Sequence, residues 1–184
     1  MSVNEYSQLN DKQLLALVAE GTRPALRELY GRYAGSVGSF VKNWLGDPME
    51  AQDIVHETML EVWRSAGRFQ GRSTVKTWLF TIARNKSIDR NRKLSRTVLQ
   101  EEEPDIVDET PNPEAVSVAF QDAERVRACI ETLSPQHKSA IHLAFYEDLS
   151  YNEIADLEKR PVGTIKTRIM HAKKLLMHCL GGTS

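Results

Sequence analysis

Apolar residues recur at steps of three and four along most of the chain, and no stretch alternates between apolar and polar positions as a half-buried β-strand would. The pattern therefore predicts an all-α protein. Four helices are expected in the first half, each with start and stop signals at its ends. They run from Asn10–Asp11 to Gly21, from Pro24 to Gly46, from Asp47–Pro48 through an inner stripe of Ile54, Val55, Met59 and Val62, and from Ser73 or Thr74 to about Arg92.

The second half predicts a set of shorter helices. One is expected over residues 116–132, and another begins at Ser134–Pro135 with Ile141, Ala144 and Phe145 turned inward. The sequence SYNE at residues 150–153 is a capping box, in which the serine and glutamate side chains satisfy each other's unpaired backbone N–H groups. It predicts a short helix that ends in a turn over residues 158–160, after which Pro161 begins a longer helix.

Between the two halves lies the stretch QEEEPDIVDETPNPE, residues 100–114, which holds seven carboxylates and three prolines without any lysine or arginine. Its low apolar content predicts a flexible linker rather than a packed element. We therefore expect two small helical domains, residues 8–96 and 116–181, joined by an acidic linker over residues 97–115.

Charge is distributed unevenly, although the formal net charge of the 184-residue chain is only −1 at pH 7. Residues 64–96 carry ten bases and one acid, and residues 159–174 carry six bases and no acid. Residues 97–124, between them, carry nine acids and no base. Two basic blocks of this kind indicate a polyanionic partner such as a nucleic acid.

Several other classes of protein and site are disfavoured. The start MSVNEYSQLN lacks the features of a signal peptide, and no run approaches the ~18 apolar residues of a membrane span, which predicts a cytoplasmic protein with no membrane insertion of its own. Cys129 and Cys179 lie far apart, so neither a disulfide framework nor a zinc finger is indicated. His171, His178 and Cys179 fall on different helix faces, so no metal site is expected. Without a nucleophile–base pair or a phosphate-binding glycine loop, no catalytic residue, cofactor or enzyme activity is expected.

The last two predicted helices, joined by a short turn, fit a helix-turn-helix motif. At 100° per residue, the second helix has a narrow apolar stripe of Ile165, Ile169, Ala172 and Leu176. Its opposite face holds Thr164, Lys166, Thr167, Met170, His171 and Lys174. This face suits a DNA major groove, because lysine reaches phosphates or guanine acceptors and threonine touches base edges. Arg168 falls nearer the core and is expected to clamp a phosphate or brace its neighbours; six bases alone would also fit a solvated surface helix.

The fourth predicted helix offers a second candidate DNA face. Its inner stripe is Val75, Trp78, Leu79 and Ile82, whereas Lys76, Phe80, Arg84, Ser87 and Asn91 lie on the far side. The Phe80 ring, between two cations, either stacks on an unpaired base or is covered by another helix. In the preceding loop, Arg68, Phe69, Gln70 and Arg72 are flanked by glycines and are expected to form a pocket for an extruded base.

Three stretches together resemble a known family. They are EAQDIVHETMLEVWR at residues 50–64, TWLFTIARNKSIDRNRK at residues 77–93 and LSYNEIADLEKRPVGTIKTRIMHAKKLL at residues 149–176. Their order and spacing are similar to those of the extracytoplasmic-function (ECF) group of alternative sigma factors of bacterial RNA polymerase. The match covers nearly the whole chain outside the linker and the first few residues.

The resemblance implies a non-enzymatic subunit that binds core RNA polymerase, contacts its flap and the clamp coiled coil of its largest subunit, and directs initiation at promoter DNA. The polymerase-binding residues implied are Asp53, His56, Glu57, Met59 and Glu61, among which the acidic ones form an unneutralised stripe at four-residue spacing. Region 2 would open the minus-ten element with Arg68, Phe69, Gln70, Arg72, Lys76, Trp78, Phe80, Arg84 and Asn85. Region 4 would read the minus-thirty-five element with Arg160, Pro161, Gly163, Thr164, Lys166, Thr167, Arg168, His171 and Lys174. An anti-sigma factor, a role in stress response and a linker that threads the RNA channel, or else shields the isolated protein, are also implied.

The chain departs from the family pattern at three places. His56 stands where the family often has glutamine, and Met59 where it often has phenylalanine, which would alter affinity for the polymerase or make it depend on pH. Trp78–Leu79 stands where housekeeping relatives carry two adjacent aromatic residues for strand opening, which implies dependence on a close promoter match. Glu158–Lys159 replaces Leu–Gly in the helix turn, so a residue other than glycine is expected to adopt an uncommon backbone conformation.

Two other functions fit parts of the pattern. A helix-turn-helix regulator acting without polymerase would bind duplex operators tightly and would not need the acidic stripe. A structural adaptor would leave both basic faces unexplained. Replacing Asp53 and Glu57 by lysine separates the first alternative from a sigma factor, because only a sigma factor would lose its association with polymerase.

Overall fold

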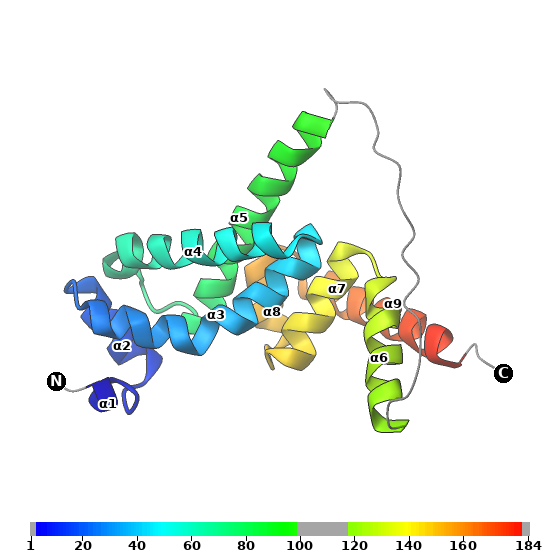
Figure 1. The fold of residues 1–184 in the computed structure, drawn as a ribbon, viewed down its shortest axis with the longest axis horizontal. Helices are drawn as coiled ribbons and strands as arrows, with labels where there is room; N and C mark the ends of the chain where they lie inside the picture. The colour runs from blue at the N-terminus through cyan, green and yellow to red at the C-terminus, as the bar shows by residue number, and fades with distance from the viewer. Residues whose placement is uncertain (1–2, 99–117, 182–184) are drawn as a thin grey trace.

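The computed structural model describes residues 3–98 and 118–181, and over these ranges it contains helices and no strand (Figure 1). The all-α prediction is thus confirmed for the described residues, whereas residues 99–115 of the expected linker lie outside them. The first domain consists of α1 (Val3–Tyr6), α2 (Asp11–Ala19), α3 (Arg23–Leu45), α4 (Pro48–Ser65), the 3-10 turn η1 (Ala66–Arg68) and α5 (Val75–Val98). The second consists of α6 (Val118–Glu131), α7 (Pro135–Ile141), the π-helical turn η2 (His142–Tyr146), α8 (Tyr151–Glu158) and α9 (Val162–Gly181).

Local side-chain chemistry sets the helix ends in the first domain. Asn10 closes a capping box with Gln13 at the start of α2, and the Asp47 carboxylate accepts the Met49 N–H at 2.7 Å at the start of α4. Gly46 ends α3 with a φ of 73°, a conformation that glycine adopts without strain. Two features were not predicted, namely the short helix α1 and the extension of α5 from Arg92 to Val98.

The core of the first domain is formed by the predicted apolar stripes of α2, α3, α4 and α5. Leu14, Leu29, Val62 and Leu79 are fully buried in one continuous cluster. Each buried leucine or valine of this kind contributes about 1.5–3 kcal/mol relative to an exposed one. The same packing holds α4 against both α3 and α5 and so fixes the surfaces that these helices present to solvent.

The second domain differs from its prediction between α7 and α8. The helix that begins at Ser134–Pro135 changes from α to π geometry at His142, and the Glu147 N–H bonds the His142 carbonyl at 3.1 Å. Ile141 is buried as expected, but Phe145 is half exposed, so its predicted inward position was wrong. The Phe145 ring instead lies against the Lys173 ammonium, 4.7 Å from it.

The two domains pack against each other through a common core. Helix α3 lies beside α7, and α5 lies beside α8, near the middle of the molecule in Figure 1. Buried residues from both domains form one cluster, which includes Phe40 and Phe80 from the first and Leu143, Ile154 and Ile165 from the second. The sequence predicted two domains joined by a linker, and the sign of this contact was Phe80, an aromatic residue on an otherwise polar face of α5.

Candidate nucleic-acid and polymerase interfaces

The helix-turn-helix is built as the capping signals predict. In the capping box of α8, Glu153 accepts the Ser150 N–H at 2.9 Å, and Ser150 Oγ accepts the Glu153 N–H at 3.3 Å. The backbone bond from Ser150 is the main reason that the pKa of the Glu153 carboxyl lies below its usual value. Helix α8 ends at Glu158, and the next residue, Lys159, caps it. The φ of 54° and ψ of 49° at Lys159 are left-handed, which confirms the expected uncommon conformation of a non-glycine residue in this turn.

Arg168 braces this turn from within the recognition helix α9. Its guanidinium forms an ion pair with the Glu158 carboxylate, which is almost fully buried and also accepts the Ser139 hydroxyl at 3.3 Å. The position agrees with the expectation that Arg168 lies near the core edge, and the structure favours the bracing role over a phosphate contact. Sequence analysis had not anticipated that Glu158, at the end of α8, would be its partner.

The outer face of α9 is exposed over its whole predicted extent. Ile165, Ile169 and Ala172 are buried as predicted, and Leu176 is partly buried. The exposed predicted minus-thirty-five residues are Arg160, Pro161, Gly163, Thr164, Lys166, Thr167, His171 and Lys174. Thr167 also bonds the Gly163 carbonyl at 3.0 Å, so its methyl and hydroxyl are held in a defined position on this face. Such a face can enter a major groove without rearrangement.

The loop between α4 and α5 is largely open to solvent. The Arg68 side chain is 77% exposed, and Gln70 and Arg72 are exposed as well. Asn85, which lies further along in α5, is also exposed. Phe69 is partly buried and packs on Trp78, with ring centroids 5.2 Å apart. The loop therefore presents a paired aromatic platform with cations beside it, a combination that suits an unpaired base and its phosphate.

The far side of α5 is covered by other helices. Of the two interpretations of Phe80, base stacking and burial under another helix, the structure therefore supports burial. Phe80 is fully buried and meets Phe40 edge-on at 5.3 Å, so this ring is a core residue and not an exposed stacking surface. Ser87, also expected on the outer side, is fully buried. The amphipathic pattern predicted one buried stripe on α5, but the helix buries two, because α3 and the second domain both pack against it there.

Two cationic side chains that were predicted on the far side of α5, Lys76 and Arg84, also contact other residues of the protein. Lys76 Nζ lies 2.9 Å from Glu147 Oε2, in the second domain. The Arg84 guanidinium lies over the Trp44 ring, 5.8 Å from its centroid. Burial lowers the pKa of Arg84; the charge of Glu158 opposes this shift, and those of Arg168 and Arg160 add to it.

The acidic face of α4 is not the unneutralised stripe that the sequence suggested. Arg90 of α5 pairs with both Glu50 and Glu57, the latter at 2.8 Å, and Glu61 lies 3.9 Å from Arg68. Asp53 is exposed on the same helix. The prediction that these carboxylates lack counter-charges was therefore wrong for Glu57 and Glu61.

An apolar groove of about 550 Å³ adjoins this face, between the N-terminal half of α3 and α4. Met59 is buried at its base, and Leu60, which the sequence analysis did not single out, is 53% exposed on its rim. His56 stacks on Tyr30 at 6.1 Å beside it. The groove, which Arg23 and Arg27 also line, is thus an exposed apolar surface beside the acidic face of α4, and exposed apolar surfaces of this kind are typical of docking sites.

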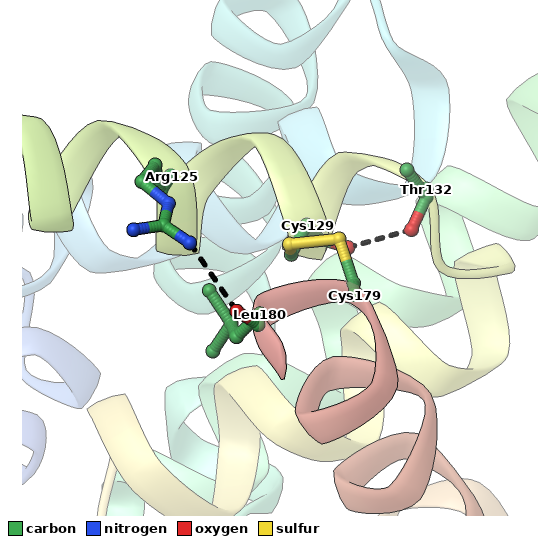
Figure 2. Close-up of a disulfide and its surroundings, with 5 residues drawn as sticks. All are labelled: Arg125, Cys129, Thr132, Cys179 and Leu180. Carbon is green, nitrogen blue, oxygen red and sulfur yellow. Dashed lines mark hydrogen bonds between the residues drawn. A yellow bond between two sulfur atoms is a disulfide. The ribbon is translucent and has the colours of Figure 1, made fainter. Parts of the chain in front are cut away.

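A disulfide joins α6 to α9, which the sequence analysis did not predict. Cys129 and Cys179 are linked, with 5.8 Å between their Cα atoms, although 50 residues separate them (Figure 2). Figure 2 shows the adjacent bond from Arg125 to the Leu180 carbonyl, at 3.2 Å, which ties the same two helices. The spacing gave no signal, because the pairing depends on how α6 lies along α9. The bond occupies Cys179, so this sulfur is not a thiolate ligand beside His171 and His178.

Family models match both domains. The family model described as "Sigma-70 region 2" matches residues 29–97, and the model described as "Sigma-70, region 4" matches residues 123–176. The ECF RNA polymerase sigma factor SigK of Mycobacterium sp. (strain JLS) is 30% identical over 172 residues, which cover 91% of this chain and 89% of that protein. This chain belongs to the ECF family of sigma factors. Like other sigma factors, it is a non-enzymatic transcription initiation factor.

Another relative and a solved structure are also similar to this ECF sigma factor. The ECF sigma-E factor of Salmonella typhimurium (strain LT2) is 29% identical over 179 residues, covering 92% of this chain and 93% of that protein. A co-crystal of the sigma factor RpoE with the anti-sigma factor NepR from Bartonella quintana superposes with a TM-score of 0.70 and 26% identity, covering 86% of this chain and 98% of that one. Among the described helices of this ECF factor, none has both the length and the apolar character that a bilayer crossing needs.

Proposed function

We propose that this ECF sigma factor binds core RNA polymerase and directs it to promoters through two DNA faces. Residues 8–96 act as region 2, residues 116–181 as region 4, and residues 97–115 join them. The exposed outer face of α9, held by a braced helix turn, carries the proposal, because its threonines and lysines are placed for a major groove. The site of action is the cytoplasm, where polymerase and chromosome lie.

The polymerase docks on α4. We assign the clamp coiled coil of the largest subunit to the groove between α3 and α4, with His56, Met59 and Leu60 in the apolar contact and Asp53 at its edge. Glu57 and Glu61 lie on the same surface, but their ion pairs with Arg90, Lys86 and Arg68 offset their charge. The exposed Asp53 carboxylate is therefore the charge that a basic partner surface complements.

The minus-ten element is held by the loop before α5 and by α5 itself. The loop residues Arg68, Phe69, Gln70 and Arg72, together with Trp78 and Asn85, receive an unpaired base and its backbone. Lys76 and Arg84 belong to the same proposed DNA face, although Glu147 and Trp44 engage them in this structure, whereas Phe80 does not, because it is buried in the core against Phe40. An anti-sigma factor is the proposed regulator, in line with the structure of the RpoE–NepR complex.

The Asp53→Lys variant tests polymerase docking. A lysine at this exposed position opposes a basic partner, so we expect roughly tenfold weaker binding to core polymerase, equivalent to about 1.4 kcal/mol. Glu20→Lys, an exposed acid at the end of α2, is the matched control with the same change of charge and should bind as the unmodified protein does. Equal binding of the two variants in a surface-immobilised core polymerase assay would contradict the assignment.

Sequencing the DNA that the holoenzyme protects tests promoter recognition. We expect protected fragments from a genomic pool to share two short conserved elements at fixed spacing, and Lys166→Ala to relax selection at the upstream element alone. Fragments without any shared element would contradict promoter-specific binding.

A further inference from the structure

We propose that a pocket beside the recognition helix binds a phosphate of the DNA backbone, and that His137 makes this contact depend on pH. The pocket lies between α7 and α9, has a volume of about 420 Å³, and is lined by His137, Gly163, Thr164, Thr167 and Arg168. His137 belongs to α7 and is not among the predicted minus-thirty-five residues. The proposal rests on the proposed function, since it takes the outer face of α9 to lie against duplex DNA.

Contacts with Ser134 determine which nitrogen of the His137 ring is available to a ligand. The Ser134 hydroxyl oxygen accepts the backbone N–H of His137 at 3.4 Å and lies 3.0 Å from His137 Nδ1. The hydroxyl proton is donated to Nδ1 when the ring is neutral, so the ring proton is on Nε2. When the ring is charged, Nδ1 donates to Ser134 instead, without movement of heavy atoms. In both states Nε2–H is the donor that the ring offers to the pocket.

The other walls of the pocket supply a second donor and open space. Thr164 is exposed, and its hydroxyl can donate to a phosphate oxygen. A Cβ added at Gly163 would meet no atom within 4 Å, so the pocket is unfilled beside this residue. Among the described residues that line the pocket, none carries a carboxylate. A bound phosphate would therefore meet donors without a repelling charge in the walls.

The charges around His137 favour an anion. Arg168 and His171, both from α9, act directly on its ring. Glu158 of α8 also lies on this side of α7, but it forms an ion pair with Arg168 and accepts the Ser139 hydroxyl. A second group of charged and titratable residues next to α7 lines a separate cleft and consists of Lys42, Arg127, Glu131, Lys138, His142 and Glu147.

These surroundings hold the pKa of His137 below its ordinary value of about 6.5. Burial is the largest cause, and the charges of Arg168 and His171 add to it. A phosphate oxygen bonded to Nε2 acts in the opposite direction, because a negative charge favours the charged ring. His137 should therefore take up a proton as duplex DNA binds. By linkage, affinity for duplex rises as the pH falls from the pKa of the bound state to that of the unbound state.

A phosphate in this pocket would fix the start of α9 against the DNA backbone. Thr164 and Thr167 belong both to the pocket and to the exposed outer face of α9, so the phosphate lies beside the groove that this face enters. Arg168 stays paired with Glu158 and contributes charge rather than a bond to the phosphate. Phosphate contacts position a protein on DNA without reading its sequence, so His137 should strengthen binding to any duplex.

Nuclear magnetic resonance titration of the histidine rings in the full chain tests the contact. Addition of a random-sequence duplex should raise the proton affinity of His137 about tenfold. His142, which is buried and lines the other cleft, is the internal control and should not respond. An unchanged titration of His137 in the presence of bound duplex overturns the proposal. Inorganic phosphate forms a second arm, in which a response to it but none to duplex would indicate a site for free anions and overturn the DNA contact.

Duplex affinity measured against pH separates His137 from His171, which is also exposed on α9. In a His171→Gln background, affinity for a fluorescent random-sequence duplex should rise about tenfold from about pH 8 to about pH 5.5. The slope of log affinity against log salt concentration should steepen by about 0.9, the value for one further phosphate. Adding His137→Gln should remove both changes, whereas adding His137→Lys should give tight binding at either pH.

Gln136→Lys, an exposed change beside His137 but outside the pocket, is the matched control and should leave the pH dependence in place. Equal pH dependence and equal salt slopes with and without His137 overturn the proposal, and so does a chain that binds no duplex at any pH. Failure of promoter-specific protection by the holoenzyme, with the response of His137 intact, would instead overturn the proposed function and leave the phosphate pocket in place.

Discussion

At the scale of single residues, the structure separates side chains that stabilise the protein from side chains that remain available to a partner. Arg168 and Lys166 are two positions apart in the recognition helix, but Arg168 pairs with a buried carboxylate whereas Lys166 is exposed. Composition assigns both to one basic helix, and helical periodicity places Arg168 nearer the core. The ion pair with the buried Glu158 favours the bracing role among the two that the sequence left open for Arg168.

Arg168→Ala should therefore destabilise the second domain. Removal of the guanidinium leaves the Glu158 carboxylate buried without its main counter-charge, at a cost of about 3–5 kcal/mol. Thermal unfolding followed by circular dichroism should show a clear loss of stability. Lys166→Ala is the matched control, with unchanged unfolding and weaker duplex binding; equal stability of the two variants would contradict the bracing role.

The Glu147 carboxyl should make stability depend on pH. Burial alone raises its pKa, but the bonds from His142 and Lys76 outweigh burial and hold the pKa below its usual value. A lowered pKa adds stability that is complete above the ordinary value of about 4.3 and disappears as the pH falls through the folded-state pKa. The free energy of unfolding should thus fall on acidification in this range. Glu147→Gln should show a shallower dependence, and an identical slope would contradict the ion pair.

At the scale of secondary-structure elements, local signals predicted the helices well and their packing less well. Capping residues such as Asn10, Asp47 and Ser150 act within one helical turn, so the sequence predicted the helix starts that the structure contains. Burial on two sides of α5 depends instead on a domain more than 40 residues away in the chain. The one signal of it was Phe80, an aromatic residue on a face that was otherwise polar.

The contact of α6 with α9 illustrates the same limit. These two helices pack side by side and carry the disulfide, so residues 50 positions apart become neighbours. Neither the cysteine spacing nor the periodicity of either helix indicates which faces meet. The acidic stripe of α4 was misjudged for the same reason, because Arg90 reaches it from α5.

Loss of the disulfide should destabilise the second domain. A cross-link that closes a loop of this length stabilises a protein by about 4 kcal/mol in the chain-entropy model. Cys129→Ser should therefore lower the unfolding temperature. Reduction with dithiothreitol should lower that of the unmodified protein to a similar value while leaving the variant unchanged. An unfolding temperature that reduction does not affect would contradict the bond between α6 and α9.

At the scale of the whole molecule, the proposed DNA faces of this sigma factor differ in their exposure. The recognition helix is exposed, the loop before α5 is exposed, and the far side of α5 is closed off by the second domain. The apolar groove beside α4 is lined by α3 and α4 alone, so the proposed polymerase contact needs no residue of the second domain. This separation of the proposed interfaces follows from the arrangement of the helices and not from any single residue.

Reconstituted transcription tests the central claim most directly. Core RNA polymerase, a pool of genomic templates and this protein are combined, and the 5′ ends of the transcripts are sequenced. The account predicts discrete start sites that depend on the protein and share upstream elements, and these starts should weaken with Asp53→Lys but not with Glu20→Lys. A set of start sites identical to that of core polymerase alone would contradict the assignment of this chain as a promoter-directing sigma factor.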